Sequence, residues 1–311
     1  AKDLLRKHFD SEGQIKQAKV FVCGLGYFEL YVNGERIGDD YLVPNMTDYT
    51  KRFDLEKGPI AISGNMSRHR VMYLAYDITK QIQEGRNALG VILGNGFYDA
   101  VNLNIPCSKF GDECLRLQLQ LTYADGTTQT VISDNTWETK PSAITLNGVH
   151  AGEIYNANLE TPLWATTEDN SQGWQRVKCI EGPTGMMTAH TAPTDKIVES
   201  LKPISLHQRE DGAWVVDFGK EISGWLHLHD LKGEKGDTVK VDYISESVQG
   251  NMRYVMNGSG SEEYAPRFTW FAFSKAVISG VKELSMKNLT ADVVNTHVEK
   301  TADFHTTDTL F

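Results

Sequence analysis

The sequence predicts an all-β protein made of two consecutive antiparallel β-sandwiches, jelly-roll-like and with very little helix. Short segments in which apolar and polar residues alternate recur along the whole chain, and this period of two is typical of strands with one buried face. The dipeptides Asn-Gly or Asp-Gly, which favour tight hairpin turns, begin at six positions: 33, 95, 125, 147, 211 and 257. Helical periodicity is almost absent, so sheets are expected to bury the core.

The clearest predicted hairpin lies near the start of the chain. Val20 and Val22 fall on one face of a first strand, and a second alternating run, 28–32, ends at Asn33-Gly34. Both central residues of a type I′ turn need positive φ, which Asn and Gly tolerate best. We therefore expect the chain to reverse at Asn33-Gly34 and to place the following loop, residues 39–49, at the rim of the sheet.

Further strands follow in the same half of the chain. In residues 115–122 every odd position is leucine and every even position is polar, so one face of this strand packs and the other meets solvent. Asp77 is placed to cap one or two helical turns at 78–83, and residues 1–17 are expected to hold an edge strand. The other predicted strands of this half are 69–76, 87–93, 129–132 and 136–140.

A change of composition marks a boundary between two domains near Pro183. Residues 182–195 contain Pro183, Gly185 and Pro193, and the alternation restarts beyond them with a predicted hairpin around Asp211-Gly212. The predicted domains are residues 1–183 and residues 184–301. The strands expected in the second domain are 203–208, 213–218, 224–231, 238–244, 268–280 and 289–298.

Charge and hydropathy exclude several classes of partner. The net charge is −10 and the pI is about 5.4, so the mean field repels nucleic acid and anionic membrane surfaces, and neither is an expected partner. No apolar run approaches the roughly 20 residues that span a bilayer. The composition alone leaves the cellular compartment open.

The cysteines and histidines give no metal-binding pattern. The four cysteines lack a C-x-x-C spacing; Cys107 and Cys114 share a loop, and their pairing is left open. His227 and His229 share one face of a predicted strand. With no third ligand close in the sequence, they are interpreted as surface polar residues.

Three loop stretches combine the groups that bind sugars. An aromatic face takes the C–H side of a pyranose, and planar carboxylate or amide groups take its hydroxyls. These stretches are expected in connections at the sheet ends. The alternative is that the aromatic residues cover the core and that Asp and Asn end strands. The chosen carbohydrate-binding candidates are Asn95, Phe97, Tyr98, Asp99, Glu153, Tyr155 and Asn158; the other members of the stretches are Asp39, Asp40, Asn45, Asp48, Tyr49, Asn102, Asn104, Asn156 and Glu160.

The same oxygen-rich loops leave two other chemistries open. Calcium takes six to eight oxygen ligands, so calcium binding is possible, although no EF-hand spacing is present. An inverting glycosidase needs two carboxyl groups roughly 6.5 to 9.5 Å apart, and Glu153 or Glu160 with Asp99 could supply them. Such a self-sufficient glycosidase is one alternative function, and a purely structural β-sandwich scaffold is the other.

Six segments carry a family resemblance that extends in order over nearly the whole chain. They read GLGYFELYVNGERIGDDYL from residue 24, TDYTKR from 47, LGVILGNGFY from 89, HAGEIYNANLE from 150, VVDFGKEISGW from 215 and PRFTWFAF from 266. In this order they resemble the N-terminal, non-catalytic region of bacterial α-L-rhamnosidases. These are glycoside hydrolases that act on terminal L-rhamnose.

The resemblance implies an accessory role. In that family the catalytic carboxylates belong to a C-terminal helical (α/α)6 barrel, and residues 302–311 look like the lead-in to such a domain. We therefore expect no catalytic residue within the 311 residues. The first domain would be a carbohydrate-binding-type sandwich, and the second would help to support the barrel. Trp270, Phe271 and Phe304 are expected to be exposed and to form part of the contact surface for the barrel. The implied partners are a rhamnose-containing glycan or glycoside and the missing catalytic domain.

The resemblance requires no cofactor and makes calcium a possible aid to rhamnose binding. One departure from the family concerns Glu153 to Asn158. This segment often reads Gly-Glu-x-Tyr-Asp-Ala-Arg in the family, whereas Asn156 and Asn158 stand here in place of the acidic and the basic residue. A charge pair is lost, so the role of that pair does not carry over.

Overall fold

The computed structural model describes residues 3–49, 69–100, 109–168, 172–245 and 250–308. These residues form three β-sheets of six, five and ten strands. In the described ranges there is no α-helix, only short 3-10 turns such as Ala157–Leu159 and Met286–Asn288, and none is long and apolar enough to cross a membrane. The predicted all-β fold class is confirmed.

The six- and five-stranded sheets form the first sandwich. The first sheet has the order β12 (Gln175–Arg176), β9 (Glu138–Pro141), β1 (Asp3–Ser11), β6 (Gly85–Gly94), β3 (Tyr27–Val32) and β4 (Glu35–Ile37). The second has the order β13 (Met186–Ala189), β5 (Arg70–Asp77), β2 (Ile15–Leu25), β7 (Cys114–Tyr123) and β8 (Thr128–Ile132). All neighbours are antiparallel except β13 and β5, which are parallel.

One apolar core joins these two sheets. Leu117, Leu119 and Leu121 of β7 are buried there, as the leucine alternation predicts. Their partners come from both sheets, including Val20 and Val22 of β2, Phe28, Leu30 and Val32 of β3, and Leu89, Val91 and Leu93 of β6. The prediction of an edge strand within residues 1–17 is wrong, because β1 lies between β9 and β6.

The predicted turn at Asn33-Gly34 is confirmed. Val32 pairs with Glu35, and both turn residues have positive φ, 50° for Asn33 and 89° for Gly34. The Asn33 side chain also donates to the oxygens of Gln81 and Asn87 and accepts from the amide of Ala88. It thereby ties the turn to the buried start of β6.

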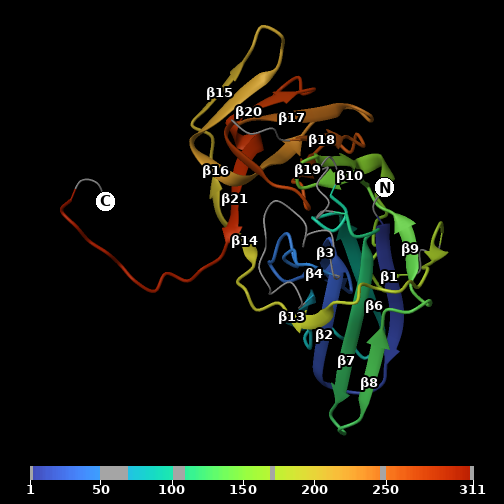
Figure 1. Ribbon diagram of the computed structural model, residues 1–311. Helices are drawn as coiled ribbons and strands as arrows, with labels where there is room; N and C mark the ends of the chain where they lie inside the picture. Colours follow the sequence, from blue (N-terminus) through green and yellow to red (C-terminus); the bar gives the residue numbers. More distant parts are fainter. Residues whose placement is uncertain (1–2, 50–68, 101–108, 169–171, 246–249, 309–311) are drawn as a thin grey trace.

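The ten-stranded sheet forms the second sandwich, which lies above the first in Figure 1. Its path is β10 (Ile144–Gly148), β11 (Gly152–Asn156), β18 (Asn251–Val255), β17 (Thr238–Ile244), β20 (Phe271–Ser279), β16 (Trp214–Leu231), β21 (Leu289–Thr296) and β14 (Asp195–Leu201). Two further strands, β15 (Ser205–Gln208) and β19 (Glu262–Tyr264), pair with β16. The hairpin predicted around Asp211-Gly212 is the β15–β16 pair.

The long strand β16 organises this second sandwich. Its pairing with β20 shifts register between Asp217 and Ile222, and its later residues pair with β21 and β19. Bulges of this kind bend a strand and increase its twist. Side chains from β16, β17, β18, β20 and β21 then close a separate apolar core around Trp225, Phe271 and Phe273.

The hairpin β10–β11 extends the second sheet although it precedes Pro183 in the sequence. Strand β11 runs parallel to β18, with Glu153 opposite Met252 and Tyr155 opposite Tyr254. The ten-stranded sheet thus uses residues from both sides of the predicted boundary, and the division at residue 183 stays a prediction. Residues 297–308 extend away from both sandwiches and are exposed.

Candidate functional site

The segment between β19 and β20 joins the two sandwiches. Arg267 donates from Nη1 to Glu29 Oε2 and to the Tyr31 hydroxyl, both at 2.7 Å. Glu29 and Tyr31 belong to β3 of the first sandwich, and Arg36 Nε contacts Glu29 Oε1 at 3.2 Å. Burial alone would raise the pKa of Glu29, but the Arg267 and Arg36 guanidinium groups hold it below its usual range.

Glu153 holds the backbone of the same segment. Its carboxylate accepts from the amides of Arg267 and Phe268 at 3.0 to 3.1 Å and from the Tyr264 hydroxyl at 2.9 Å. Glu153 is completely buried, and burial raises its pKa to about 7 although these donors favour the ionised form. Both carboxylate oxygens of Glu153 therefore accept hydrogen bonds from groups of the protein itself.

Phe268 fills the space between the sandwiches. Its ring is buried against Leu4, Tyr27, Leu42 and Ile92 of the first sandwich. Gly94 permits this approach, because a Cβ there would lie 2.4 Å from Cγ of Phe268. The aromatic contact and the two glutamates together fix one orientation of the segment 266–270.

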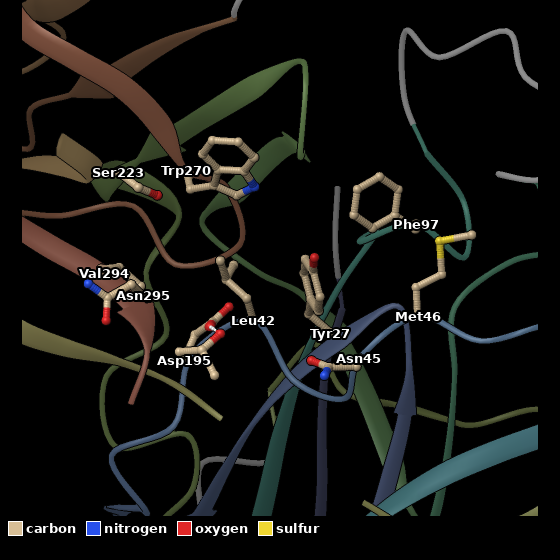
Figure 2. Close-up of a pocket in the computed structure, with 11 residues that line it drawn as sticks. Tyr27, Leu42, Asn45, Met46, Phe97, Asp195, Ser223, Trp270, Val294 and Asn295 are labelled. Atoms are coloured by element: carbon tan, nitrogen blue, oxygen red, sulfur yellow. Dashed lines mark hydrogen bonds between the residues drawn. The ribbon is translucent and has the colours of Figure 1, made fainter. Parts of the chain in front are cut away.

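A cleft opens beside this junction, with a volume of about 390 Å³. Figure 2 shows Asp195, Asn295 and Ser223 on one side and Phe97 with Met46 on the other, with Trp270 and Tyr27 between them. Its walls come from β3 and the loop after β4, the turn after β6, and β14, β16, β20 and β21 with their flanks. The remaining lining residues are Leu42, Asn45, Val294 and Thr296.

Asp195 is positioned in the cleft wall by both sandwiches. Its carbonyl accepts from the Tyr41 amide at 2.8 Å, and its Oδ1 accepts from the Thr296 hydroxyl at 2.8 Å. A carboxylate, two amides (Asn45 and Asn295) and the half-buried Trp270 ring therefore face one space. This is the combination of planar polar groups and aromatic faces that suits a sugar.

The structure separates the predicted carbohydrate-binding residues. Phe97 lines the cleft, whereas Asn95 and Tyr98 on the same turn are buried. The Asn95 side-chain amide donates to the carbonyl and Oδ2 of Asp99, and its backbone amide donates to Oδ1 of Asn147. Tyr98 packs against Tyr49 and Phe110. These neighbours shape the turn that presents Phe97.

The third predicted stretch lies on the β10–β11 hairpin and just after it. Glu153 and Tyr155 are within strand β11 rather than in a connection, contrary to the expectation from sequence. Tyr155 stacks on Tyr254 and donates to Glu160, and Asn158 is exposed, with its amide donating to the Met256 carbonyl. Neither residue lines the cleft.

Several cleft residues were not chosen as ligands from the sequence. Asn45 is in the first oxygen-rich stretch, and Trp270 is predicted from the sequence to contact the catalytic domain rather than a sugar. Asp195 and Asn295 gave no signal, because each stands in an ordinary polar context far from Phe97 in sequence. Asn102, Asn104 and Cys107 lie outside the described residues, so the Cys107–Cys114 pairing stays open.

Comparison with known families shows where this fold belongs. The sequence profile described as "Alpha-L-rhamnosidase N-terminal domain" matches residues 13–60 and 64–199, which is more than half of the chain. The chain belongs to the α-L-rhamnosidase family. The profile described as "Bacterial alpha-L-rhamnosidase concanavalin-like domain" matches residues 207–295. The resemblance noted in the sequence is thereby confirmed.

Individual α-L-rhamnosidases agree with this assignment. One from Formosa agariphila is 30% identical over 337 aligned positions, covering 100% of this chain and 33% of that protein. The solved structure of an α-L-rhamnosidase from Dictyoglumus thermophilum matches with a TM-score of 0.85 and 32% identity over 96% of this chain and 33% of that one. The structure of the α-L-rhamnosidase from Streptomyces avermitilis in complex with L-rhamnose matches with a TM-score of 0.85 and 26% identity. This match covers 95% of the present chain and 29% of the Streptomyces avermitilis chain.

The chain spans about a third of the length of these α-L-rhamnosidases. It corresponds to their N-terminal region. The prediction of an N-terminal rhamnosidase region with a β-sandwich fold is therefore confirmed.

Proposed function

We propose that this chain is the accessory part of an α-L-rhamnosidase and binds a rhamnose-containing glycan or glycoside in the cleft between its two sandwiches. The observation that carries the proposal is the cleft itself, where Trp270 and Phe97 supply aromatic faces and Asp195 with Asn45 and Asn295 supplies hydroxyl partners. Its volume, about 390 Å³, falls within the range of roughly 300 to 1,000 Å³ typical of small-ligand sites. The related Streptomyces avermitilis enzyme was crystallised with L-rhamnose.

The predicted site residues take different roles in this proposal. Phe97 contacts the ligand, and Asn95, Tyr98 and Asp99 hold its turn in place. Glu153 maintains the cleft by fixing the segment that carries Trp270. Direct sugar contacts by Tyr155 and Asn158 remain predictions about a second surface.

The second part of the proposal is support of a catalytic domain. The chemistry of hydrolysis would then reside outside these residues, consistent with the use of Glu153 as a buried structural acceptor. Phe304, 79% exposed on the extended segment 297–308, offers an apolar contact to such a domain. Phe271, interpreted from sequence as part of this contact surface, is instead buried in the second core.

The proposal needs no organic cofactor, and calcium binding remains a prediction. Two measurements on the chain test the proposal: titration with L-rhamnose by tryptophan fluorescence and calorimetry, with and without calcium, and an assay with a chromogenic rhamnoside. We expect saturable binding and no turnover. Phe97→Ala and Trp270→Ala should remove binding, and Phe304→Ala, a control outside the cleft, should retain it.

The alternative functions predict different results in the same measurements. Turnover by the chain would favour the self-sufficient glycosidase. Absence of both binding and turnover would favour the purely structural scaffold. Binding that survives both Phe97→Ala and Trp270→Ala would place the sugar elsewhere, and Tyr155→Ala and Asn158→Ala would then be measured.

A further inference from the structure

His227, His229 and Glu263 bring three ligand atoms together on the second sandwich. One ligand atom from each lies within 4.8 Å of the other two, and among the described residues this is the one such cluster of His, Cys, Asp or Glu. Nε2 of His227 is 2.7 Å from Glu263 Oε1, and Nδ1 of His229 is 3.3 Å from the same oxygen. The cluster is separate from the cleft, whose lining contains none of the three.

The sheet explains why these side chains meet. His227 and His229 are two residues apart on β16 and therefore point to the same face. Around Leu228, β16 pairs with β21 through Leu289 and with β19 through Tyr264. Glu263 of β19 thus reaches the two imidazoles from a neighbouring strand. Sequence reasoning missed this third ligand because it lies 34 positions beyond His229 and depends on that pairing.

The far nitrogen of each ring has a partner on β21. Nδ1 of His227 is 3.2 Å from Asp292 Oδ2, and Nε2 of His229 is 2.8 Å from the Thr290 hydroxyl. Asp292 is itself buried and accepts from the Ser200 hydroxyl at 2.6 Å. With an ion bound, a proton held on each far nitrogen would leave the lone pair of the other nitrogen for the metal. Orientation of this kind by a carboxylate or hydroxyl is typical of metal-binding histidines.

We infer that His227, His229 and Glu263 bind a divalent transition-metal ion, with zinc as the best fit, and that this ion braces β19 against β16. Two imidazole nitrogens and one carboxylate oxygen suit zinc, with water in the fourth position. Tetrahedral coordination at zinc distances of about 2.0 to 2.2 Å separates ligand atoms by about 3.3 to 3.6 Å. The Glu263 side chain is 64% exposed, so its carboxylate can move the roughly 0.6 to 0.9 Å that separate the 2.7 Å contact from this range. The ligand set distinguishes the site from calcium sites, which use oxygen.

Zinc binding to the chelator-treated 311-residue chain tests this inference directly. We expect one Zn²⁺ per chain by calorimetry, a rise in the thermal unfolding midpoint on adding Zn²⁺, and visible absorption of a tetrahedral Co²⁺ complex. A large excess of Ca²⁺ should not compete. Absence of saturable Zn²⁺ and Co²⁺ binding would overturn the inference.

Variants locate the ion. His229→Ala and Glu263→Gln should each weaken Zn²⁺ binding by roughly a hundredfold, and Thr290→Val, which removes only an orienting hydroxyl, by about tenfold. His207→Ala changes an exposed histidine on β15 and should leave the affinity unchanged. The thermal unfolding midpoint of each variant in the presence of chelator identifies any variant that fails to fold. If a histidine variant fails to fold, Glu263→Gln still tests the site, because the Glu263 side chain is 64% exposed. Equal Zn²⁺ affinity in Glu263→Gln and the parent would refute the site.

Discussion

Nη1 of Arg267 lies 2.7 Å from Oε2 of Glu29, and these residues are 238 positions apart in the sequence. The contact joins strand β3 of the first sandwich to the segment that precedes β20 of the second. Glu153 binds the backbone of the same segment, and Phe268 inserts its ring into the first sandwich. One short segment therefore sets the relation of the two sandwiches and the position of Trp270 in the cleft.

Replacing Arg267 with Ala should destabilise the protein by about 2 kcal/mol, because it leaves the buried Glu29 carboxylate without its main counter-charge. The expected loss lies below the roughly 3 to 5 kcal/mol typical of a broken buried pair, because Arg36 and the Tyr31 hydroxyl remain beside Glu29 and the Arg267 side chain is 33% exposed. The unfolding free energy from denaturant titration measures it. Arg209→Ala, which breaks the exposed pair with Asp211, should change stability by less than about 0.5 kcal/mol. Equal effects in the two variants would contradict the role of Glu29.

Gly94→Ala should destabilise the protein through one identified collision. The new Cβ would lie 2.4 Å from Cγ of Phe268, so the ring and the segment that carries it must shift. Phe268→Ala alone should cost about 3 to 5 kcal/mol through the lost burial. In the double variant the contacts with Cγ and Cδ1 of the ring are absent and only the 2.8 Å approach to Cβ of residue 268 is left, so the cost of the double variant should be clearly less than the sum of the single costs. Additive costs in this double-mutant cycle would show that the two residues do not meet.

Features of the fold that depend on neighbouring residues could be predicted from the sequence, whereas the pairing of strands that are far apart in the sequence could not. The leucine alternation of β7 and the Asn33-Gly34 turn are local features, and both are confirmed by burial and by positive φ. The pairing of β11 with β18 joins strands about a hundred residues apart, and alternation within one strand does not specify its neighbour. For the same reason β1 was wrongly expected at an edge.

The candidate site shows the same division. Phe97 was chosen because aromatic and amide residues cluster in its turn, which is a local signal. Glu153 looked equally suitable in sequence, yet the amides that surround it belong to Arg267 and Phe268. Asp195 and Trp270 join the cleft only through the packing of one sandwich on the other. A pocket at such a junction cannot be read from any single segment.

The buried Glu153 should make stability depend on pH. Burial raises its pKa from 4.5 to about 7 in the folded protein, so the folded state binds a proton more tightly than the unfolded state. Protonated Glu153 therefore adds about 3 kcal/mol to the free energy of unfolding below about pH 4.5. This contribution is lost as the pH rises toward and through 7. Tyr264 and Arg267, the ionisable groups that face Glu153, do not titrate in this range.

The measurement compares the unfolding free energies of the parent and Glu153→Gln from pH 4 to pH 8. Gln cannot titrate, and the cost of placing its amide near backbone donors does not depend on pH. The advantage of the parent should therefore shrink across this range. A constant difference would show that the hydrogen bonds to Glu153 keep its pKa at the ordinary value.

Asp195 should contribute to rhamnose affinity through its charge if the cleft is the binding site. Asp195→Asn keeps the shape and leaves an acceptor for the Thr296 hydroxyl, but it removes the charged acceptor that a sugar hydroxyl would use. Hydrogen bonds to charged groups contribute about 1.5 to 3 kcal/mol, so the dissociation constant should rise at least about tenfold. Calorimetric titration with L-rhamnose measures this change. Asp211→Asn, in the exposed β15–β16 turn, is the matched control because it also removes one negative charge. A loss of affinity in Asp195→Asn alone would show that the position of Asp195 in the cleft matters. Equal rhamnose affinities in the two variants would exclude Asp195 as a ligand.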